Sequence, residues 1–364
     1  MPSFTNPFFL GSAGEVAGRE ALMPPLQQLM TERGRRMVVF GRRRMGKTAL
    51  IRAAAGRARG TFVYCEVSTA TGLGEVARKL MGAAPEEEGL RLGRTLEIAG
   101  RCLKSVGVSA GRITLTGELR SEDGRKTLEG VLNFLNERAA ANYEVWTVCL
   151  DGFQEIRAMG GSEGDWQLGG VTREHKSLNY IFAGSDPRLV GWMTGAGGSK
   201  QLQRMEVGPV GTDEMARWID GRAGAGGLRN FSSGGRIVTA AGPCTGDIIR
   251  LAKAVFSVAT GSTPKDIVAA AFDSIALGDL HGEYVDHWRS LPASQRGMLR
   301  AIADGRQPTA SDTLREYGLR AASTASTAIE ALVERQFLAR TDAGVVFDSP
   351  FFRRWVAFNG PPRA

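Results

Sequence analysis

The fold of this chain is decided by residues 41–48, which read Gly41-Arg42-Arg43-Arg44-Met45-Gly46-Lys47-Thr48. They fit G-x-x-x-x-G-K-[ST], the pattern of a phosphate-binding loop. The two glycines allow a tight turn that points successive backbone N–H groups at phosphate oxygens. The lysine brings a positive charge to the β- and γ-phosphates, and the threonine hydroxyl is a ligand for Mg²⁺.

The segments on either side of this loop are those that a phosphate-binding loop requires. Residues 36–40 (RMVVF) predict a short buried strand, and residues 49–58 (ALIRAAAGRA) predict a helix. A helix that starts at Thr48 aims the positive end of its dipole at the same anion. We therefore expect residues 41 to 48, together with Ala49, to form a nucleotide site.

Composition indicates an ordinary globular protein with a moderate positive charge. The chain has 364 residues, of which 43% are hydrophobic and 23% are charged, and its net charge is +8. That length suffices for two or three domains. No apolar run is long enough to span a membrane, and the N-terminus lacks the features of a signal peptide. Four widely spaced cysteines argue against a zinc site or a disulfide framework, so we expect a cytoplasmic protein with reduced thiols.

Strands that alternate with helices predict an α/β fold with a mostly parallel sheet, the fold of P-loop nucleotide-binding proteins. Three further segments read as apolar strands: 61–67, 144–151 and 179–185. The active face of a parallel sheet lies at the carboxyl ends of its strands. Gly41, Asp151 and Ser185 each stand at such an end, so we expect them to lie near one another.

Three further segments predict a hairpin, a loop and a helix outside the main sheet. Residues 107–119 alternate apolar and polar side chains and predict a hairpin-like extension, whereas the glycine-rich residues 160–170 predict a flexible loop. Residues 237–259 read as helix after Pro243.

The C-terminal part has a different pattern from about residue 286. Three short predicted helices precede a turn at Asp342-Ala343-Gly344, which indicates a two-stranded wing and hence a winged-helix domain. The final helix places Phe351 and Trp355 on one face, as anchors to the domain core. The predicted domains are an α/β domain over 1–210, a helical lid over 211–285 and a winged helix over 286–364.

Asp151 closes an apolar strand about a hundred residues after the loop. A Walker B aspartate, which holds Mg²⁺, belongs at such a position, although an aspartate that caps a turn is the ordinary alternative. The next residue is Gly152, where ATPases of this broad type carry a glutamate that orients the attacking water. Glycine has no side chain for this task. We therefore expect hydrolysis to be slow, triggered by a partner or absent, and a glutamate at position 152 should raise the rate if the remaining geometry is intact. Gln154 is an alternative water-positioning residue, as glutamine is in small GTPases.

Three more residues are candidates for the site, and each also has an ordinary structural interpretation. Ser185 has the position of a sensor of the γ-phosphate, or is a simple strand terminus. Arg204 is a candidate arginine finger, in cis or from a neighbouring subunit, or a surface arginine. Pro243 precedes a predicted helix near the expected nucleotide, or only starts that helix.

Together these motifs resemble those of the archaeal-type ATPase family, which belongs to the wider AAA+/STAND group. The resemblance extends along nearly the whole chain, and its most specific motif is the P-loop. The matching segments are AGRE with Leu22, GRRRMGKTAL, LDGFQEI, FAGSDPRLV, Gln203-Arg204 with Gly208-Pro209-Val210, Ala241-Gly242-Pro243, and FDSPFFRRW at 347–355. Two residues depart from the family pattern: Gly152 replaces the catalytic glutamate, and Ser349 interrupts an Asp-Pro pair.

The resemblance implies bound ATP or ADP with Mg²⁺, a helical lid and a winged helix. Three functions fit: an ATP-driven switch or assembly ATPase, a DNA-binding regulator whose nucleotide is structural, and a protein-interaction scaffold. Double-stranded DNA, a protein partner and a second copy of the chain are the corresponding partners. Arg315, Arg320 and Arg335 favour DNA, whereas the small side chains of the intervening helix argue against strong base reading.

Overall fold

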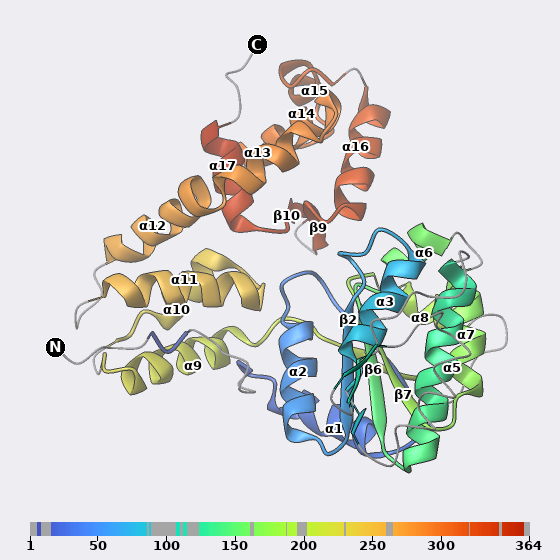
Figure 1. The fold of residues 1–364 in the computed structure, drawn as a ribbon. Coiled ribbons are helices and arrows are strands. Elements are labelled where there is room, and N and C mark those ends of the chain that lie inside the picture. Colours follow the sequence, from blue (N-terminus) through green and yellow to red (C-terminus); the bar gives the residue numbers. More distant parts are fainter. Residues whose placement is uncertain are drawn as a thin grey trace. The chain divides into compact units, whose positions relative to one another are not determined.

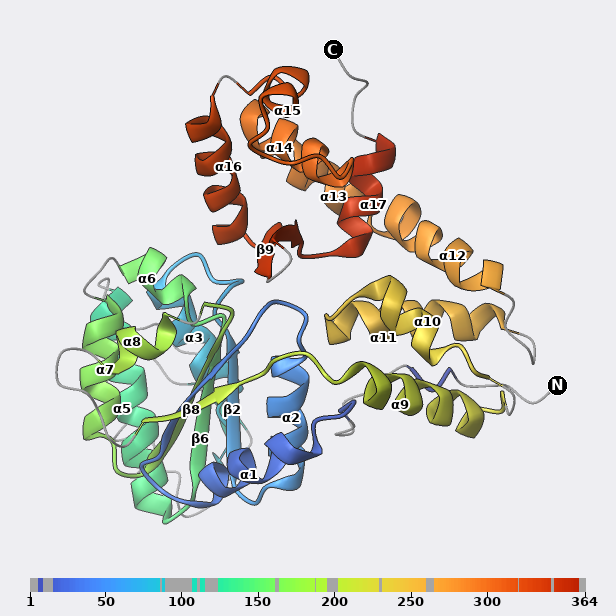
Figure 2. The ribbon, with the colours of Figure 1, turned by 180° about the vertical axis from the view of Figure 1, so that it is seen from behind.

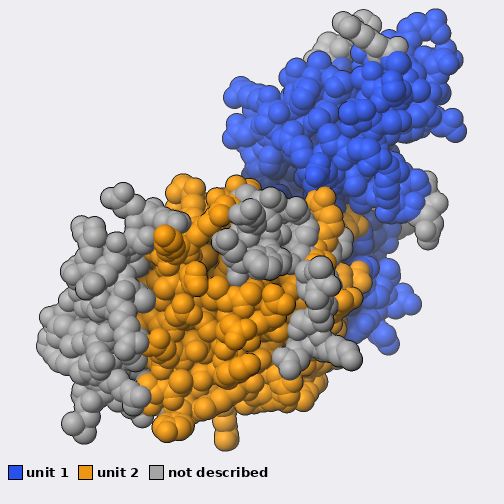
Figure 3. Space-filling model, turned by 90° about the vertical axis from the view of Figure 1, so that its right-hand side faces the viewer, with its two compact units in different colours: residues 1–10, 43–45, 209–364 blue, residues 11–42, 46–208 orange. Residues whose placement is uncertain are grey.

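The structure, a computed structural model, describes most of the chain. The described residues are 6–8, 16–85, 87–88, 107–109, 112–114, 124–160, 164–186, 188–194, 202–228, 231–259, 265–319, 321–341 and 344–359. The chain divides into two compact units, which are coloured blue and orange in Figure 3. Unit 1 comprises residues 1–10, 43–45 and 209–364, and unit 2 comprises residues 11–42 and 46–208.

Unit 2 is built around a five-stranded sheet in which every strand pair is parallel (Figures 1 and 2). The strand order is β2-β6-β7-β1-β8. The strands are β1 (Arg36–Phe40), β2 (Thr61–Glu66), β6 (Trp146–Asp151), β7 (Leu178–Gly184) and β8 (Leu202–Glu206). The predicted α/β fold with a parallel sheet is confirmed.

Helices cover both faces of this sheet. Figure 1 shows α1 (Met23–Thr31) and α2 (Lys47–Arg57) on one side, and α3 (Leu73–Ala83), α5 (Gly124–Asn142), α7 (Gly164–Glu174) and α8 (Leu189–Thr194) on the other. Alternate strand residues face each layer, so Val148 and Leu150 pack with Leu132 and Leu135 of α5 in one buried core. Burial of these side chains is the main stabilising contribution.

A second, three-stranded sheet has the order β3-β5-β4 and is antiparallel. Its strands are β3 (Glu87–Glu88), β4 (Gly107–Ser109) and β5 (Arg112–Thr114). The β4–β5 pair agrees with the hairpin expected over 107–119, of which residues 110–111 and 115–119 lie outside the described residues.

The prediction of a flexible loop over residues 160–170 is wrong for most of that segment. The chain forms α6 (Glu155–Gly160) and then α7, which begins at Gly164. Glycine disfavours a helix interior by about 1 kcal/mol. Burial of Leu168 and Thr172 on α7, with a 2.8 Å hydrogen bond from the Thr172 hydroxyl to the Leu168 carbonyl, outweighs this preference.

Unit 1 is mainly helical between residues 212 and 289. Its helices here are α9 (Thr212–Ala225), α10 (Gly234–Ala241), α11 (Thr245–Val258), α12 (Lys265–Ser274), a π-helical turn (Ile275–Asp279) and α13 (His281–Arg289). Residues 237–259 form two helices, because Gly242 adopts a φ of 73° and ends α10 before Pro243. Among the described helices of the chain, none has the length and hydropathy of a membrane-spanning segment.

The C-terminal elements form three helices, a wing and a final helix. They are α14 (Ala293–Ala303), α15 (Ser311–Glu316), α16 (Ala322–Glu334), β9 (Leu338–Thr341), β10 (Gly344–Phe347) and α17 (Pro350–Asn359). The wing strands pair antiparallel. Phe351 and Trp355 are buried as expected, and the Trp355 ring lies 5.9 Å from Trp288 and 6.1 Å from Phe352.

A polar triad of buried His175, buried Tyr180 and exposed Asn133 lies at the amino end of β7. The Nδ1 atom of His175 lies 2.5 Å from the Tyr180 hydroxyl, and its Nε2 lies 2.8 Å from the Asn133 side-chain oxygen. Because that oxygen only accepts, Nε2 carries the proton and Nδ1 accepts from the tyrosine. Burial lowers the pKa of His175 from 6.5 to about 4.

This triad predicts a loss of stability in acid. Between pH 6.5 and about 4 the unfolded chain binds a proton at His175 that the folded chain does not. The free energy of unfolding should therefore fall by about 1.4 kcal/mol for each pH unit below 6.5 from this group alone. Denaturant unfolding of wild type, His175→Gln and the control His281→Gln from pH 7 to 4.5 measures it. A slope equally steep in His175→Gln and in wild type would contradict the assignment.

Candidate nucleotide site

The phosphate-binding loop connects β1 to α2 through backbone conformations that suit glycine. Gly41 has a φ of 150° and Gly46 a φ of 86°. A Cβ on Gly41 would lie 2.3 Å from the Val207 carbonyl oxygen, whereas a Cβ on Gly46 would meet no described atom within 4 Å. Close packing thus requires glycine at position 41, and the left-handed backbone favours it at position 46. The open space beside Gly46 suits a phosphate group.

Lys47 is buried as the first residue of α2. Its ammonium donates hydrogen bonds to the carbonyl oxygens of Gly41 at 2.7 Å and of Arg42 at 2.8 Å. The positive charge is thereby held inside the loop, beside the amino end of a helix. Both features favour an anion at this place.

Thr48 and Asp151 meet at the carboxyl end of β6. The Thr48 hydroxyl donates to the Asp151 carboxylate over 2.5 Å. Their direct contact shows that the end of the loop and the end of β6 lie side by side. They are a hydroxyl and a carboxylate, the oxygen ligands that Mg²⁺ takes from P-loop proteins.

Tyr64 is part of this site and was not predicted from the sequence. Its hydroxyl lies 3.0 Å from the same Asp151 oxygen, and the Arg52 guanidinium of α2 lies 4.2 Å from the centre of its ring. Burial, followed by the nearby Asp151 carboxylate, raises the pKa of Tyr64 well above its ordinary value, so the hydroxyl remains a donor. The signal in the sequence is weak: a tyrosine two residues before the end of an apolar strand.

The Thr48 and Asp151 oxygens suit Mg²⁺ better than they suit a metal ion whose ligands all come from the protein. Among the described residues, no group of three or more His, Cys, Asp or Glu side chains is placed to hold an ion. Mg²⁺ usually keeps several waters and binds through one or two protein oxygens plus substrate phosphates. Thr48 and Asp151 supply that number of oxygens.

Gly152 has a structural reason to be glycine. Its φ is 78°, and a Cβ at this position would lie 3.0 Å from the Ser68 backbone nitrogen and 3.1 Å from the Ser68 Cβ. Any other side chain would therefore be strained by its backbone and by its neighbour. The expectation that a glutamate at position 152 would raise the rate conflicts with this geometry.

Gln154 and Ser185 lie together at the carboxyl end of β7. The Ser185 backbone N–H donates to the Gln154 side-chain oxygen over 3.4 Å. A Cβ on Gly184 would lie 2.4 Å from that oxygen, so glycine makes room for the glutamine. The Gln154 amide therefore links the ends of β6 and β7.

The other residues of the loop differ in exposure. Met45 is buried, Arg42 is half-buried, and Arg43 and Ala49 are exposed. The three residues 43–45 group with unit 1. Arg42 and Arg43 thus add positive charge to the loop, although neither side chain is buried.

Arg44 is held by groups of unit 1. Its guanidinium lies 3.2 Å from an Asp247 oxygen of α11 and 2.7 Å from an Asp348 oxygen, just before α17. Its carbonyl accepts a 2.7 Å hydrogen bond from the Gly246 N–H. Its φ is 60°, which is unfavourable for a residue with a side chain. Two carboxylates and a backbone bond thus maintain this conformation.

The remaining candidates are not brought to Lys47 by any described contact. Arg204 lies within β8 opposite Val38, two residues before the strand ends, and is exposed. Pro243 is exposed in unit 1, two residues before α11. Their roles as arginine finger and lid contact stay predictions.

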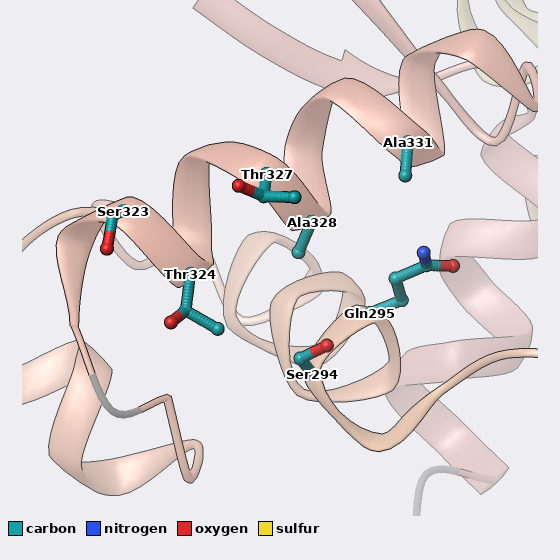
Figure 4. Close-up of a pocket in the computed structure, with 7 residues that line it drawn as sticks. All are labelled: Ser294, Gln295, Ser323, Thr324, Thr327, Ala328 and Ala331. Atoms are coloured by element: carbon teal, nitrogen blue, oxygen red, sulfur yellow. The ribbon is translucent and has the colours of Figure 1, made fainter.

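The C-terminal part contains a hollow between α14 and α16 (Figure 4). Its volume is about 310 Å³. It is lined by Ser294, Gln295, Ser323, Thr324, Thr327, Ala328 and Ala331. None of these is charged. The arginines expected around α16 lie outside this lining, and Arg320 lies outside the described residues.

Known proteins share this architecture. Residues 282–358 match a family described as a probable winged helix domain. A Walker-type ATPase of Pyrococcus abyssi matches with a TM-score of 0.67 and 16% identity over 96% of this chain and 99% of that one. The Orc1 protein of Aeropyrum pernix, solved in complex with DNA, matches with a TM-score of 0.53 and 13% identity over 98% and 96%. The comparison with curated proteins finds no match.

The likeness extends over almost the full length of both chains, although the sequences are far apart. The parallel sheet with its P-loop and the winged helix at the C-terminus occur in the same order along the chain as the family resemblance implied. The chain therefore has a fold similar to those of the Pyrococcus abyssi Walker-type ATPase and of the Orc1 protein, with a probable winged helix domain over residues 282–358.

Proposed function

We propose that this protein binds ATP and ADP with Mg²⁺ and acts as a nucleotide-dependent switch or assembly ATPase with slow turnover. One observation carries the proposal: the hydroxyl of Thr48 at the start of α2 contacts the Asp151 carboxylate at the end of β6. In P-loop proteins these two groups hold the metal of a bound nucleoside triphosphate. The AAA+ fold supports the same function.

The residues of the site then have separate tasks. The backbone of residues 41–48 cradles the phosphates, and Lys47 binds the β- and γ-phosphate oxygens. Thr48 and Asp151 would hold Mg²⁺, which would neutralise charge that develops on the phosphates. Ser185, whose N–H donates to the Gln154 side chain, would sense the γ-phosphate. Arg204 and Pro243 complete the proposal as arginine finger and lid contact.

We further propose that the chain works as three parts with the boundaries expected from sequence: an ATPase domain, a lid and a winged helix. The lid and the winged helix would respond to the nucleotide, because Arg44 of the loop binds Asp247 and Asp348 of these parts. Such coupling is the defining property of a switch.

DNA association is the second candidate function, and the Orc1 likeness favours it. The distribution of charge argues against a strong electrostatic contribution from the winged helix. Residues 282–358 contain ten basic and nine acidic residues, a net charge of +1. The first 59 residues contain eleven basic and three acidic residues, which matches the +8 of the whole chain. The excess positive charge thus belongs to the segment that includes the phosphate-binding loop.

Loss of the loop lysine should abolish tight nucleotide binding. Lys47→Ala removes a charge-assisted contact of about 1.5–3 kcal/mol, so the dissociation constant for Mg-ATP should rise more than about tenfold. Titration of a fluorescent ATP analogue measures it. Lys176→Ala, which removes an exposed lysine before β7, is the matched control. Equal affinity in a folded Lys47→Ala protein would contradict the assignment.

A glutamate at position 152 should destabilise the protein. Gly152→Glu forces a side chain onto a positive φ beside Ser68, at a cost of about 1–3 kcal/mol in the free energy of unfolding. Urea denaturation measures it. Gly56→Ala on α2, where a Cβ would meet no described atom within 4 Å, should be neutral or slightly stabilising. A Gly152→Glu protein as stable as wild type and faster in hydrolysis would restore the original expectation.

Duplex DNA should bind weakly. With a net charge of +1 on the winged helix, we expect a dissociation constant of about 10⁻⁴ to 10⁻⁶ M at physiological salt, the range of non-specific binding. Fluorescence anisotropy with a random-sequence duplex at several salt concentrations tests it. If α16 contacts the backbone, Arg335→Ala should reduce the salt slope by about one. Nanomolar binding that persists at high salt would favour the DNA-binding regulator instead.

A further inference from the structure

The parallel register places a second carboxylate directly beside Asp151. Glu66 is the last residue of β2, and its Cα is the ladder partner of the Asp151 Cα. The pairing continues past this point, because the Val67 N–H donates to the Asp151 carbonyl over 2.7 Å. Paired strands lie about 4.8 Å apart. Glu66 and Asp151 are therefore neighbours at the carboxyl edge of the sheet.

Glu66 faces the same side of the sheet as the phosphate-binding loop. Side chains alternate along a strand, so Tyr64 and Glu66 share one face. Tyr64 reaches Asp151 and packs under Arg52 of α2, which identifies that face as the one covered by α2. The Glu66 carboxylate is exposed on this face and can be reached by water and by a ligand.

The segment after β2 holds this carboxylate in place. The Ser68 hydroxyl donates to a Glu66 side-chain oxygen over 3.2 Å. Ser68 is also the residue that occupies the space beside Gly152. The missing side chain at position 152 thus allows the approach of the residue that orients Glu66.

The residues that follow Asp151 suit the role of a base less well. Gln154 accepts a hydrogen bond from the Ser185 N–H, and an amide does not take up a proton at neutral pH. Glu155 lies beyond a turn, with its N–H bonded to the Gly152 carbonyl, and begins α6. Neither is paired in the sheet with the metal-binding aspartate.

We propose that Glu66 is the catalytic base of ATP hydrolysis in this protein, in place of the glutamate that related ATPases carry after the Walker B aspartate. The proposal rests on the proposed function. The Glu66 carboxylate accepts a proton from water as the water oxygen bonds to the γ-phosphorus. The bond from that phosphorus to the β–γ bridging oxygen breaks, ADP leaves with the bond electrons, and the proton passes from Glu66 to solvent. The products are ADP, inorganic phosphate and one proton.

The test compares Glu66→Gln with Glu206→Gln in the full-length chain. Glu206 ends β8, the opposite edge strand of the same sheet, and is exposed like Glu66. Both substitutions remove one charge from a strand-terminal glutamate, so a general effect of charge appears in both. Lys47→Ala reports the loss of nucleotide binding.

Two measurements give separate readouts. Equilibrium titration with Mg-ATP and Mg-ADP should show that Glu66→Gln raises the preference for ATP over ADP about three- to tenfold, because a carboxylate that repels the γ-phosphate is removed. Single-turnover hydrolysis should fall by about 10²–10⁴ in Glu66→Gln. Glu206→Gln should match wild type in both measurements.

The outcomes separate this inference from the function on which it rests. Wild-type protein that binds no nucleotide would overturn the proposed function and the role of Glu66 together. Wild-type protein that binds ATP but does not hydrolyse it would leave the switch intact and overturn the catalytic role. Glu66→Gln protein that hydrolyses ATP like Glu206→Gln, with an unchanged ATP preference, would also overturn that role.

Discussion

The contact between Thr48 and Asp151 is the constraint on which the rest of the site depends. The two residues come from elements that are not neighbours in the sheet, because β7 lies between β1 and β6. The loop after β1 crosses the carboxyl end of β7, so that α2 begins beside the end of β6. The glycine backbone at positions 41 and 46 permits that crossing, and the buried Lys47 closes the loop on its own carbonyl groups. Tyr64 and Glu66 lie near this contact because β2 pairs with β6.

Much of the fold could be predicted because its strong patterns are local. Continuous apolar runs mark β1, β6 and β7, which are buried on both faces, and the motif places α2 within two residues of its observed start. The strand β8 was harder to find, since Gln203, Arg204 and Glu206 interrupt its apolar pattern at an exposed edge. The helix α7 was missed because its glycines predict a loop, and packing of Leu168 decides otherwise.

Only those residues of the candidate site that belong to a local sequence motif could be predicted. Lys47, Thr48 and Asp151 belong to such motifs, and the structure brings them together. Tyr64 and Glu66 depend on which strand pairs with β6. Strand order is set by long-range packing, and no local pattern in TFVYCE encodes it. The absence of a glutamate at position 152 was visible in the sequence, but its cause was not, because the left-handed backbone and the contact with Ser68 exist only in the folded chain.

The packing of Ser68 against Gly152 has a consequence for how this chain can change over evolutionary time. A single substitution that returns glutamate to position 152 meets the Ser68 backbone, which no replacement of the Ser68 side chain can remove. Ser68 also binds Glu66, so moving its segment disturbs a second carboxylate. Substitutions at positions 152 and 66 are therefore expected to depend on each other. A substitution at position 152 would therefore be felt at Glu66 as well, because both positions contact Ser68.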